Sequence, residues 1–168
     1  MILLVNDANI LIDLLKTCLI DQFFGLLYDF HVSDFAVNEI HETNVVKLDT
    51  FIKDKRLIKW NFNFNELLEI QSLEIKYKKL SISDCSCLYL AGRLTATLLT
   101  GDSVLRNVAK KNGITVHGIL WVFDELVKHN RISPEKACKK LKNLIEINPR
   151  LPEDECLKRM NRWKKGPS

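Results

Sequence analysis

The sequence predicts a three-layer α/β domain, in which a central parallel sheet of about five strands is flanked by helices. Short apolar runs typical of buried strands alternate along the chain with stretches of helical periodicity. This alternation implies strand–helix–strand units with right-handed crossovers. The 168 residues are 46% hydrophobic and 27% charged, which suits one well-buried domain and argues against a disordered chain.

Three strands are predicted in the first part of the chain. Residues 1–6 form the continuous apolar run MILLVN, and helical periodicity follows over residues 10–15. Residues 30–33 form the second strand, and Ser33 at its end is expected to cap the next helix. Residues 57–60 form a third, weaker strand.

Cap signals place the two helices that precede the fourth strand. Asn63 stands three residues before Glu66, a capping-box spacing that opens a long helix ending in the basic run 76–79. Ser83 is expected to cap the next helix, with Asp84 in its first turn.

Two further strands and a helical tail complete the prediction. Residues 97–100 and 114–117 form short strands, joined by a helix that ends at an Asn-Gly pair. The last third of the chain is helical. We therefore divide the chain into a core domain over residues 1–129 and a C-terminal helical extension over residues 130–168, which we expect to pack on the same domain.

Charge and cysteine content exclude several classes of protein. Residues 1–84 hold nine Lys and Arg against thirteen acidic residues, whereas residues 85–168 hold sixteen against eight. A basic half can meet a polyanion such as RNA, although from charge alone a solvated basic surface is the simpler explanation. Five scattered cysteines argue against a disulfide framework and a structural zinc. No apolar run approaches the roughly 20 residues of a membrane span, so we expect a cytoplasmic protein without a membrane partner.

Acidic residues follow the strands of the predicted sheet. Asp7 comes directly after the first strand, Glu39 lies in the helix after the second, and Asp102 follows the fourth. Ligands of open parallel sheets bind outside the carboxyl ends of the strands, so these carboxylates should face one edge. Asp84 reaches this edge only if its helix begins there, which we expect to require a crossover in the reverse of the usual sense. The residues alone leave its position open.

Carboxylates gathered at one point raise one another's pKa values unless a cation neutralises them. The ligands here would all be oxygens, without His or Cys nearby, which favours Mg²⁺ or Mn²⁺ over Zn²⁺. Asn9 could add an amide oxygen or support the ligands, and Thr100 could orient a metal-bound water. One or two such ions could polarise a phosphodiester and generate hydroxide, as in metal-dependent nucleases.

Each of these acids also has a structural explanation. Asp7 and Asp102 can cap the helices that follow them. Glu39 can be a solvated surface residue, and Asp84 suits the positive end of a helix dipole. Because an acid at the end of a buried strand is costly without a partner, Asp7 is the best functional candidate of the four.

Four segments of the chain resemble the PIN-domain nucleases and, within them, the VapC-like toxins of bacterial and archaeal toxin–antitoxin pairs. They are NDANILI at 6–12, VSDFAVNEI at 32–40, SDCSCLYLA at 83–91 and LLTGDSVLRNVAKKNGITV at 98–116. The resemblance implies a PIN-like fold and endoribonuclease activity. It further implies a homodimer and inhibition by an antitoxin peptide that lies across the cleft. The residues that it assigns to binding of Mg²⁺ or Mn²⁺ are Asp7, Glu39, Asp84 and Asp102.

One position departs from the family pattern and keeps other functions open. Ala8 stands where family members usually have Thr or Ser, whose hydroxyl supports the metal ligands. The main hypothesis is a metal-dependent endoribonuclease that acts as the toxin of a toxin–antitoxin pair. The alternative is a catalytically degenerate PIN fold that binds RNA or protein. A phosphatase with an aspartyl nucleophile is disfavoured, because that chemistry commonly wants a second acid where this chain has Asn9.

Three basic residues are candidates for contact with RNA phosphates: Arg93, Arg106 and Lys110. Arg106 and Lys110 are four residues apart, on one face of the helix that Asp102 starts. For each of them alone, a solvated helix face is the better explanation.

Overall fold

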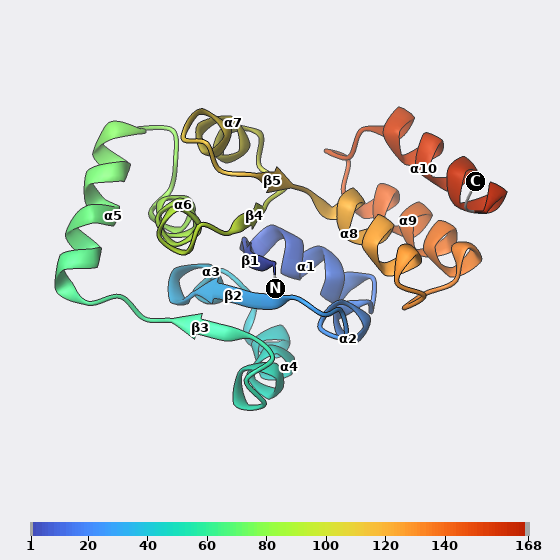
Figure 1. The fold of residues 1–168 in the computed structure, drawn as a ribbon, viewed down its shortest axis with the longest axis horizontal. Coiled ribbons are helices and arrows are strands. Elements are labelled where there is room, and N and C mark those ends of the chain that lie inside the picture. Colours follow the sequence, from blue (N-terminus) through green and yellow to red (C-terminus); the bar gives the residue numbers. More distant parts are fainter. Residues whose placement is uncertain (1, 167–168) are drawn as a thin grey trace.

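The computed structural model describes residues 2–166, apart from the side chains of residues 42 and 43. Five strands form one parallel sheet in the order β3-β2-β1-β4-β5, and helices pack against it (Figure 1). The predicted three-layer α/β fold is confirmed. The strands are β1 (Leu3–Asn6), β2 (Asp29–Ser33), β3 (Ile58–Trp60), β4 (Thr97–Leu99) and β5 (Val116–His117).

Ten helices lie within the described residues. They are α1 (Ala8–Lys16), α2 (Ile20–Phe23), α3 (Asp34–Asn38), α4 (Glu42–Lys53), α5 (Phe64–Lys76), α6 (Ile82–Leu94), α7 (Ser103–Lys111), α8 (Ile119–Lys128), α9 (Pro134–Ile147) and α10 (Glu153–Lys165). Two of them, α2 and α4, have no counterpart in the prediction from sequence. None of these helices is long and apolar enough to cross a membrane.

The strand order reverses between β1 and β4. From β1, the chain adds β2 and β3 on one side, whereas β4 and β5 lie on the other. Asn6 at the end of β1 is the register partner of Leu99 at the end of β4. Asp7 and Thr100 therefore emerge side by side at the carboxyl edge, at the point where open parallel sheets bind their ligands.

Continuous apolar runs place β1 and β4 in the centre of the core. Leu4, Val5, Leu98 and Leu99 are fully buried, as expected for parallel strands with helices on both faces. Burial of both faces explains why these strands read as unbroken apolar runs. The polar residues that follow the two strands are consequently held on a rigid base.

Two of the predicted caps are confirmed and one is wrong. Ser33 accepts a hydrogen bond from the Ala36 amide, and Asn63 and Glu66 form a reciprocal capping box. The cap of α6, however, is Ser81 and not Ser83. The spacing of Ser81 and Asp84 permits a second capping box, which satisfies two amide donors at once.

The prediction that Glu39 lies within a helix is wrong. α3 ends at Asn38, and Glu39 is its C-cap residue. The chain turns after Ile40 and continues into α4, so the helical stretch after β2 is broken in two. Glu39 therefore lies in a connection between helices, where its side chain is exposed.

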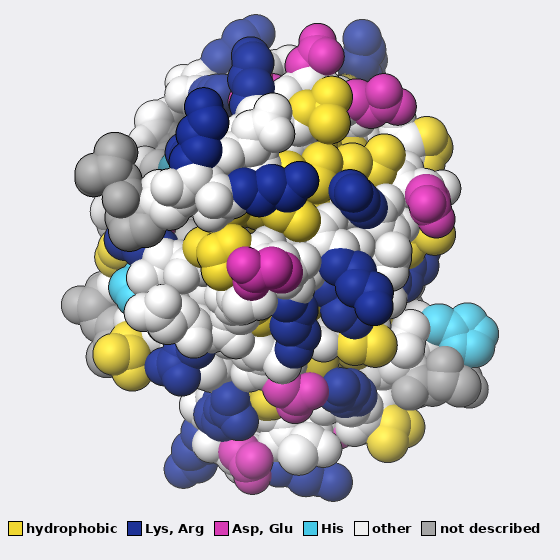
Figure 2. All heavy atoms as spheres, turned by 90° about the vertical axis from the view of Figure 1, so that its right-hand side faces the viewer, with side chains coloured by type: hydrophobic (Ala, Val, Ile, Leu, Met, Phe, Trp, Pro, Cys, Tyr) yellow, Lys and Arg dark blue, Asp and Glu magenta, His cyan; other side chains and the backbone are white. Residues whose placement is uncertain are grey.

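The C-terminal helices pack together at one side of the molecule (Figure 1). α9 and α10 contact each other and α8. Asp124 of α8 accepts hydrogen bonds from Arg159 Nε at 3.0 Å and from Trp163 Nε1 at 2.9 Å, which ties α10 to α8. Figure 2 shows Lys and Arg side chains, with acidic ones among them, over this side of the molecule. The domain boundary at residue 129 stays a prediction.

Candidate functional site at the carboxyl edge of the sheet

Asp7 occupies the switch point between β1 and β4. Its amide donates to the Leu99 carbonyl at 3.0 Å, and the residue is only 3% exposed. Although Asp7 is the N-cap residue of α1, its carboxylate accepts no capping hydrogen bond from the described residues of that helix. Oδ2 instead accepts from Thr100 Oγ1 at 2.6 Å and from Asn9 Nδ2. The capping explanation therefore does not account for this carboxylate.

The pKa of Asp7 is raised, in part because other acidic groups lie near it. Burial raises it to about 6, and the hydrogen bond from Thr100 opposes the rise. The negative charges of Asp84 and Glu39 raise it further. Three of the four predicted carboxylates thus lie near enough to one another at the carboxyl edge for their charges to interact.

Asp84 and Glu39 come to this edge from two different elements. The carboxylate of Asp84 accepts from the Ser81 amide at 2.8 Å and from its hydroxyl at 2.9 Å. Burial and the charge of Asp84 both raise the pKa of Glu39, against the effect of the Ser83 hydroxyl. Glu39 and Asp84 therefore lie near each other as well as near Asp7.

The expected reversed crossover at Asp84 is wrong. Two residues separate the end of α6 from the start of β4, so α6 ends near the amino end of that strand. A helix that leads into a parallel strand runs antiparallel to it, so α6 begins at the carboxyl edge. Asp84 in its first turn reaches the site through an ordinary connection.

Asn9 and Thr100 join the β1–α1 and β4–α7 connections. Asn9 Oδ1 accepts from the Gly101 amide at 2.8 Å, so this oxygen is directed at the loop and not into the site. Thr100 Oγ1 accepts from the Asp102 amide at 3.0 Å while it donates to Asp7. Both side chains orient the Asp7 carboxylate. The expected role of Thr100 toward a metal-bound water stays a prediction.

Asp102 caps α7. Its Oδ1 accepts from the Leu105 amide at 2.8 Å, so helix capping accounts for one of its two carboxylate oxygens. Its link to Asp7 runs through its own amide and the Thr100 hydroxyl.

The residues at the edge fit an oxygen-ligated cation such as Mg²⁺. Among residues 2–166, no three His, Cys, Asp or Glu side chains converge closely enough to enclose a metal ion. Magnesium, however, keeps several waters and is commonly held by only one or two carboxylates. A buried carboxylate with acidic neighbours and no cationic partner among the described groups that shift its pKa suits such an ion.

Comparison with known proteins identifies the family of the chain. A profile of the PIN-domain family matches residues 3–165, nearly the whole chain. The chain belongs to the PIN-domain family. No curated protein matches the sequence.

Two solved structures have a similar fold. VapBC-1 from nontypeable Haemophilus influenzae gives a TM-score of 0.51 at 14% identity, covering 71% of this chain and 99% of that chain. VapBC2 from Rickettsia felis, bound to a DNA fragment from their promoter, gives 0.50 at 14% identity, covering 70% and 98%. At this identity the likeness shows the fold alone.

Buried hydroxyls of this PIN domain were not predicted as part of the site. Ser86 Oγ donates to Ser33 Oγ at 2.7 Å, which ties α6 to the end of β2. Ser83 is also buried, and its hydroxyl has no hydrogen bond of good geometry with any described residue. The three-residue spacing of Ser83 and Ser86 on the inner face of α6 is the sequence signal that could have revealed them.

The predicted phosphate contacts of this PIN domain lie in different surroundings. Arg93 pairs with Glu66 and stacks over the Trp60 ring at 5.3 Å. It lies nine residues beyond Asp84 on α6, about 13 Å along the helix. Lys110 is exposed on α7, whereas the Arg106 guanidinium binds the Thr100 carbonyl at 2.7 Å. Lys110 is therefore the simplest candidate for contact with a phosphate.

Proposed function

We propose that this protein is a metal-dependent endoribonuclease, which hydrolyses RNA phosphodiesters with a water activated by Mg²⁺ or Mn²⁺. Asp7 carries the proposal. It is buried at the switch point of the sheet, its carboxylate is not used as a helix cap, and the charges of Glu39 and Asp84 face it. Such a carboxylate is costly to ionise unless a cation binds it.

Some residues at the edge would bind the ion, and others would orient the residues that bind it. A bound Mg²⁺ or Mn²⁺ supplies positive charge and an activated water. Asp7 would hold it, with Oδ2 oriented by Thr100 and Asn9. Glu39 and Asp84 would hold the ion or its waters, as would the oxygen of Asp102 that does not cap α7.

The cleavage products follow from the nucleophile. Attack by an external water leaves a 5′-phosphate and a 3′-hydroxyl. Lys110, exposed on α7 beyond Asp102, would contact a phosphate of the RNA and not a base.

We also propose that the protein is the toxin of a toxin–antitoxin pair and forms a homodimer. Membership of the PIN-domain family and the fold shared with two VapBC structures support this role. The partner would be an antitoxin with a segment that covers the edge at Asp7.

A degenerate PIN fold that binds RNA or protein without cutting it is the second candidate. Two observations favour it: no three carboxylates enclose a metal site in the described chain, and the buried Ala8 supplies no hydroxyl beside Asp7. Thr100 already donates a hydroxyl to Asp7, which weakens the argument from Ala8.

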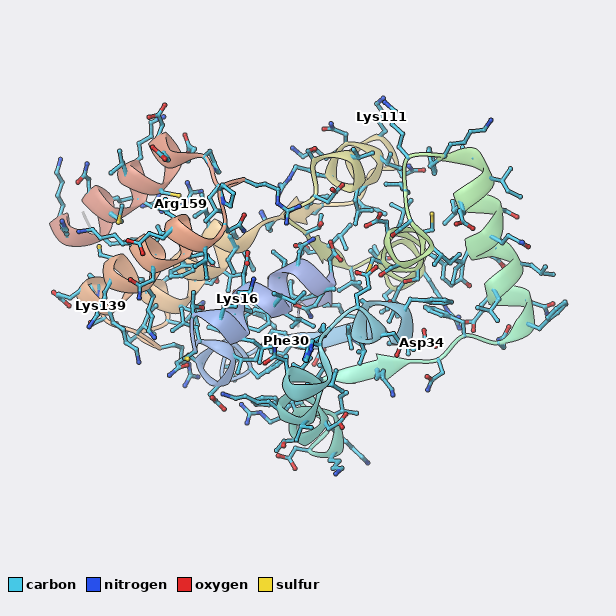
Figure 3. All side chains as sticks on the ribbon, turned by 180° about the vertical axis from the view of Figure 1, so that it is seen from behind. Lys16, Phe30, Asp34, Lys111, Lys139 and Arg159 are labelled. Carbon is cyan, nitrogen blue, oxygen red and sulfur yellow. The ribbon has the colours of Figure 1, made fainter. Side chains whose placement is uncertain are left out.

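Cleavage of a mixed, end-labelled RNA pool tests the proposal. The purified protein is assayed with Mn²⁺, Mg²⁺ or EDTA, beside Asp7→Asn and Asp102→Asn. Asp34→Asn is the matched control, because Asp34 follows β2 at the same edge (Figure 3), and its carboxylate accepts from the neighbouring Phe35 amide.

Cutting that needs metal, survives in the control and disappears in both other variants would support the nuclease. Equal cutting by all variants would indicate a contaminant and remove the site. A wild-type protein that neither cuts RNA nor binds Mn²⁺ would favour the binding module.

A further inference from the structure

Every polar group of Thr100 is engaged. Its amide donates to the His117 carbonyl at 3.0 Å, and its hydroxyl bridges the Asp102 amide and the Asp7 carboxylate. Its carbonyl accepts from Arg106 Nη2 at 2.7 Å. Thr100 is fully buried, so this bond joins a charged guanidinium to a backbone oxygen that water does not reach.

Gly118 leaves the space that the guanidinium occupies. A Cβ at this position would lie 2.8 Å from Arg106 Nη2 and 3.5 Å from the Thr100 carbonyl oxygen. The backbone of Gly118, with φ −120° and ψ −173°, is extended and open to any residue. A side chain at this position would therefore displace the Arg106 guanidinium and not strain the backbone.

The positive charge of Arg106 also acts on His117, in the strand beside Thr100. Burial lowers the pKa of His117, and the positive charge of Arg106 lowers it further. His117 is the last residue of β5, and its carbonyl accepts a hydrogen bond from the Thr100 amide. The guanidinium is thus directed inward, toward the junction of β4, β5 and α7.

We infer that Arg106 is a positioning residue for the site at Asp7, and that Gly118 provides the space in which it acts. By fixing the Thr100 carbonyl, Arg106 fixes the hydroxyl that orients Asp7 Oδ2. This role replaces the expected contact between Arg106 and RNA phosphate. Its consequence for metal binding rests on the proposed function, whereas its consequence for the loop does not.

Two substitutions separate the roles of Arg106. Arg106→Ala removes the guanidinium, and Gly118→Ala keeps the arginine and its charge but displaces it with one methyl group. Each is measured for Mn²⁺ affinity, RNA affinity, and hydrogen exchange of the Gly101 and Asp102 amides. Lys111→Ala is the control, because this exposed cation lies at the outer end of α7 (Figure 3).

Both variants should bind Mn²⁺ about tenfold more weakly, the lower end of the usual effect of losing a residue that supports metal ligands. The Gly101 and Asp102 amides should exchange faster in both. The double variant should be no worse than Arg106→Ala alone, since the added methyl then has nothing to displace. Lys111→Ala should leave metal affinity and exchange unchanged.

The opposite pattern would overturn the inference. Arg106→Ala would then weaken RNA binding while Mn²⁺ affinity and amide exchange stayed at the wild-type level, and Gly118→Ala would change nothing. Additive effects in the double variant would also remove the role of Gly118. If Arg106→Ala does not fold, Gly118→Ala alone decides between these outcomes.

Failure of the proposed function is a separate result. A wild-type protein that binds no Mn²⁺ would refute the metal site, and the amide exchange of the variants would still decide whether Arg106 holds the loop.

Discussion

The β1–α1 and β4–α7 junctions are adjacent and similar, yet the carboxylates of their aspartates have different hydrogen-bond partners. Asp7 and Asp102 each follow a buried parallel strand and each occupy the N-cap position of the next helix with extended backbone. Asp102 caps its helix, whereas Asp7 is turned toward Thr100 and Asn9. The Leu105 amide thus takes one carboxylate oxygen of Asp102, whereas no amide of the described part of α1 caps the Asp7 carboxylate, which is buried and faces the charges of Glu39 and Asp84.

The environment of each carboxylate explains the difference. Asp7 directly follows a central strand, Thr100 directly follows the neighbouring strand beside it, and two further acids lie near. A donor from a neighbouring strand competes with the helix amides for its oxygens. Asp102 has the Leu105 amide as its side-chain partner.

The largest expected effect is the loss of cleavage in Asp7→Asn. The amide cannot supply the negative charge that a cation needs, so the rate should fall about a thousandfold, the scale on which loss of a catalytic carboxylate acts. Single-turnover cleavage of RNA in Mn²⁺ measures it. Near-wild-type rates would place the chemistry away from the β1–α1 junction.

The same substitution should stabilise the protein at neutral pH. The unfolded chain releases the Asp7 proton near the ordinary pKa of 3.8, whereas the folded chain holds it to about 6. The folded state thus binds more protons in this window, and its stability falls as pH rises through it. The cost above the window is about 3 kcal/mol, and Asp7→Asn should recover up to that amount.

Denaturant unfolding in EDTA at neutral pH and near pH 4 checks this expectation. The gain should shrink to less than about 1 kcal/mol near pH 4, where Asp7 is protonated in the folded state and only about half protonated in the unfolded chain. A gain of equal size at both pH values would mean that the charge of Asp7 is not its cause.

Thr100→Val should destabilise the protein by about 2 kcal/mol at neutral pH, because a buried carboxylate loses a hydroxyl donor. The pKa of Asp7 should rise further, since the Thr100 hydrogen bond holds it down. The destabilisation should therefore be smaller at acidic pH. NMR titration of the Asp7 carboxyl carbon measures the pKa, and an unchanged value would show that Asn9 alone orients the carboxylate.

The smallest expected effect on stability is at the capping aspartate. Asp102→Ala should cost about 1 kcal/mol of stability, while Asp102→Asn should cost little because Asn is an equally good N-cap. If Asp102→Asn folds normally and still loses cleavage, the second carboxylate oxygen belongs to the metal site. Thermal unfolding paired with the cleavage assay separates the cap from the ligand.

Local patterns were enough to predict the elements around the site. The apolar runs before Asp7 and Thr100 predicted two buried strands, and the parallel sheet that follows from their spacing placed both residues at one edge. The Asn63 capping box was also predictable, because both of its partners lie within one turn. Such features depend on neighbours in the chain, which a sequence displays directly.

The errors arose where two local signals compete. Ser81 and Ser83 are both capable caps, and the reciprocal bonds between Ser81 and Asp84 decide for the first. The sequence predicts a longer helix after β2 than the structure contains, and it places Glu39 inside that helix and not at its end. In each case the sequence allows two geometries, and the tertiary structure shows which one forms.

The sequence by itself determined the parallel sheet, its helical layers and the acidic residues at its carboxyl edge, because apolar periodicity and strand–helix alternation are properties of the chain. Only the tertiary structure decided which aspartate caps its helix and which accepts from Thr100 instead. It also turned Arg106 from an expected RNA contact to the Thr100 carbonyl, through the space at Gly118. Those choices depend on donors and gaps contributed by distant segments, and no local pattern records them.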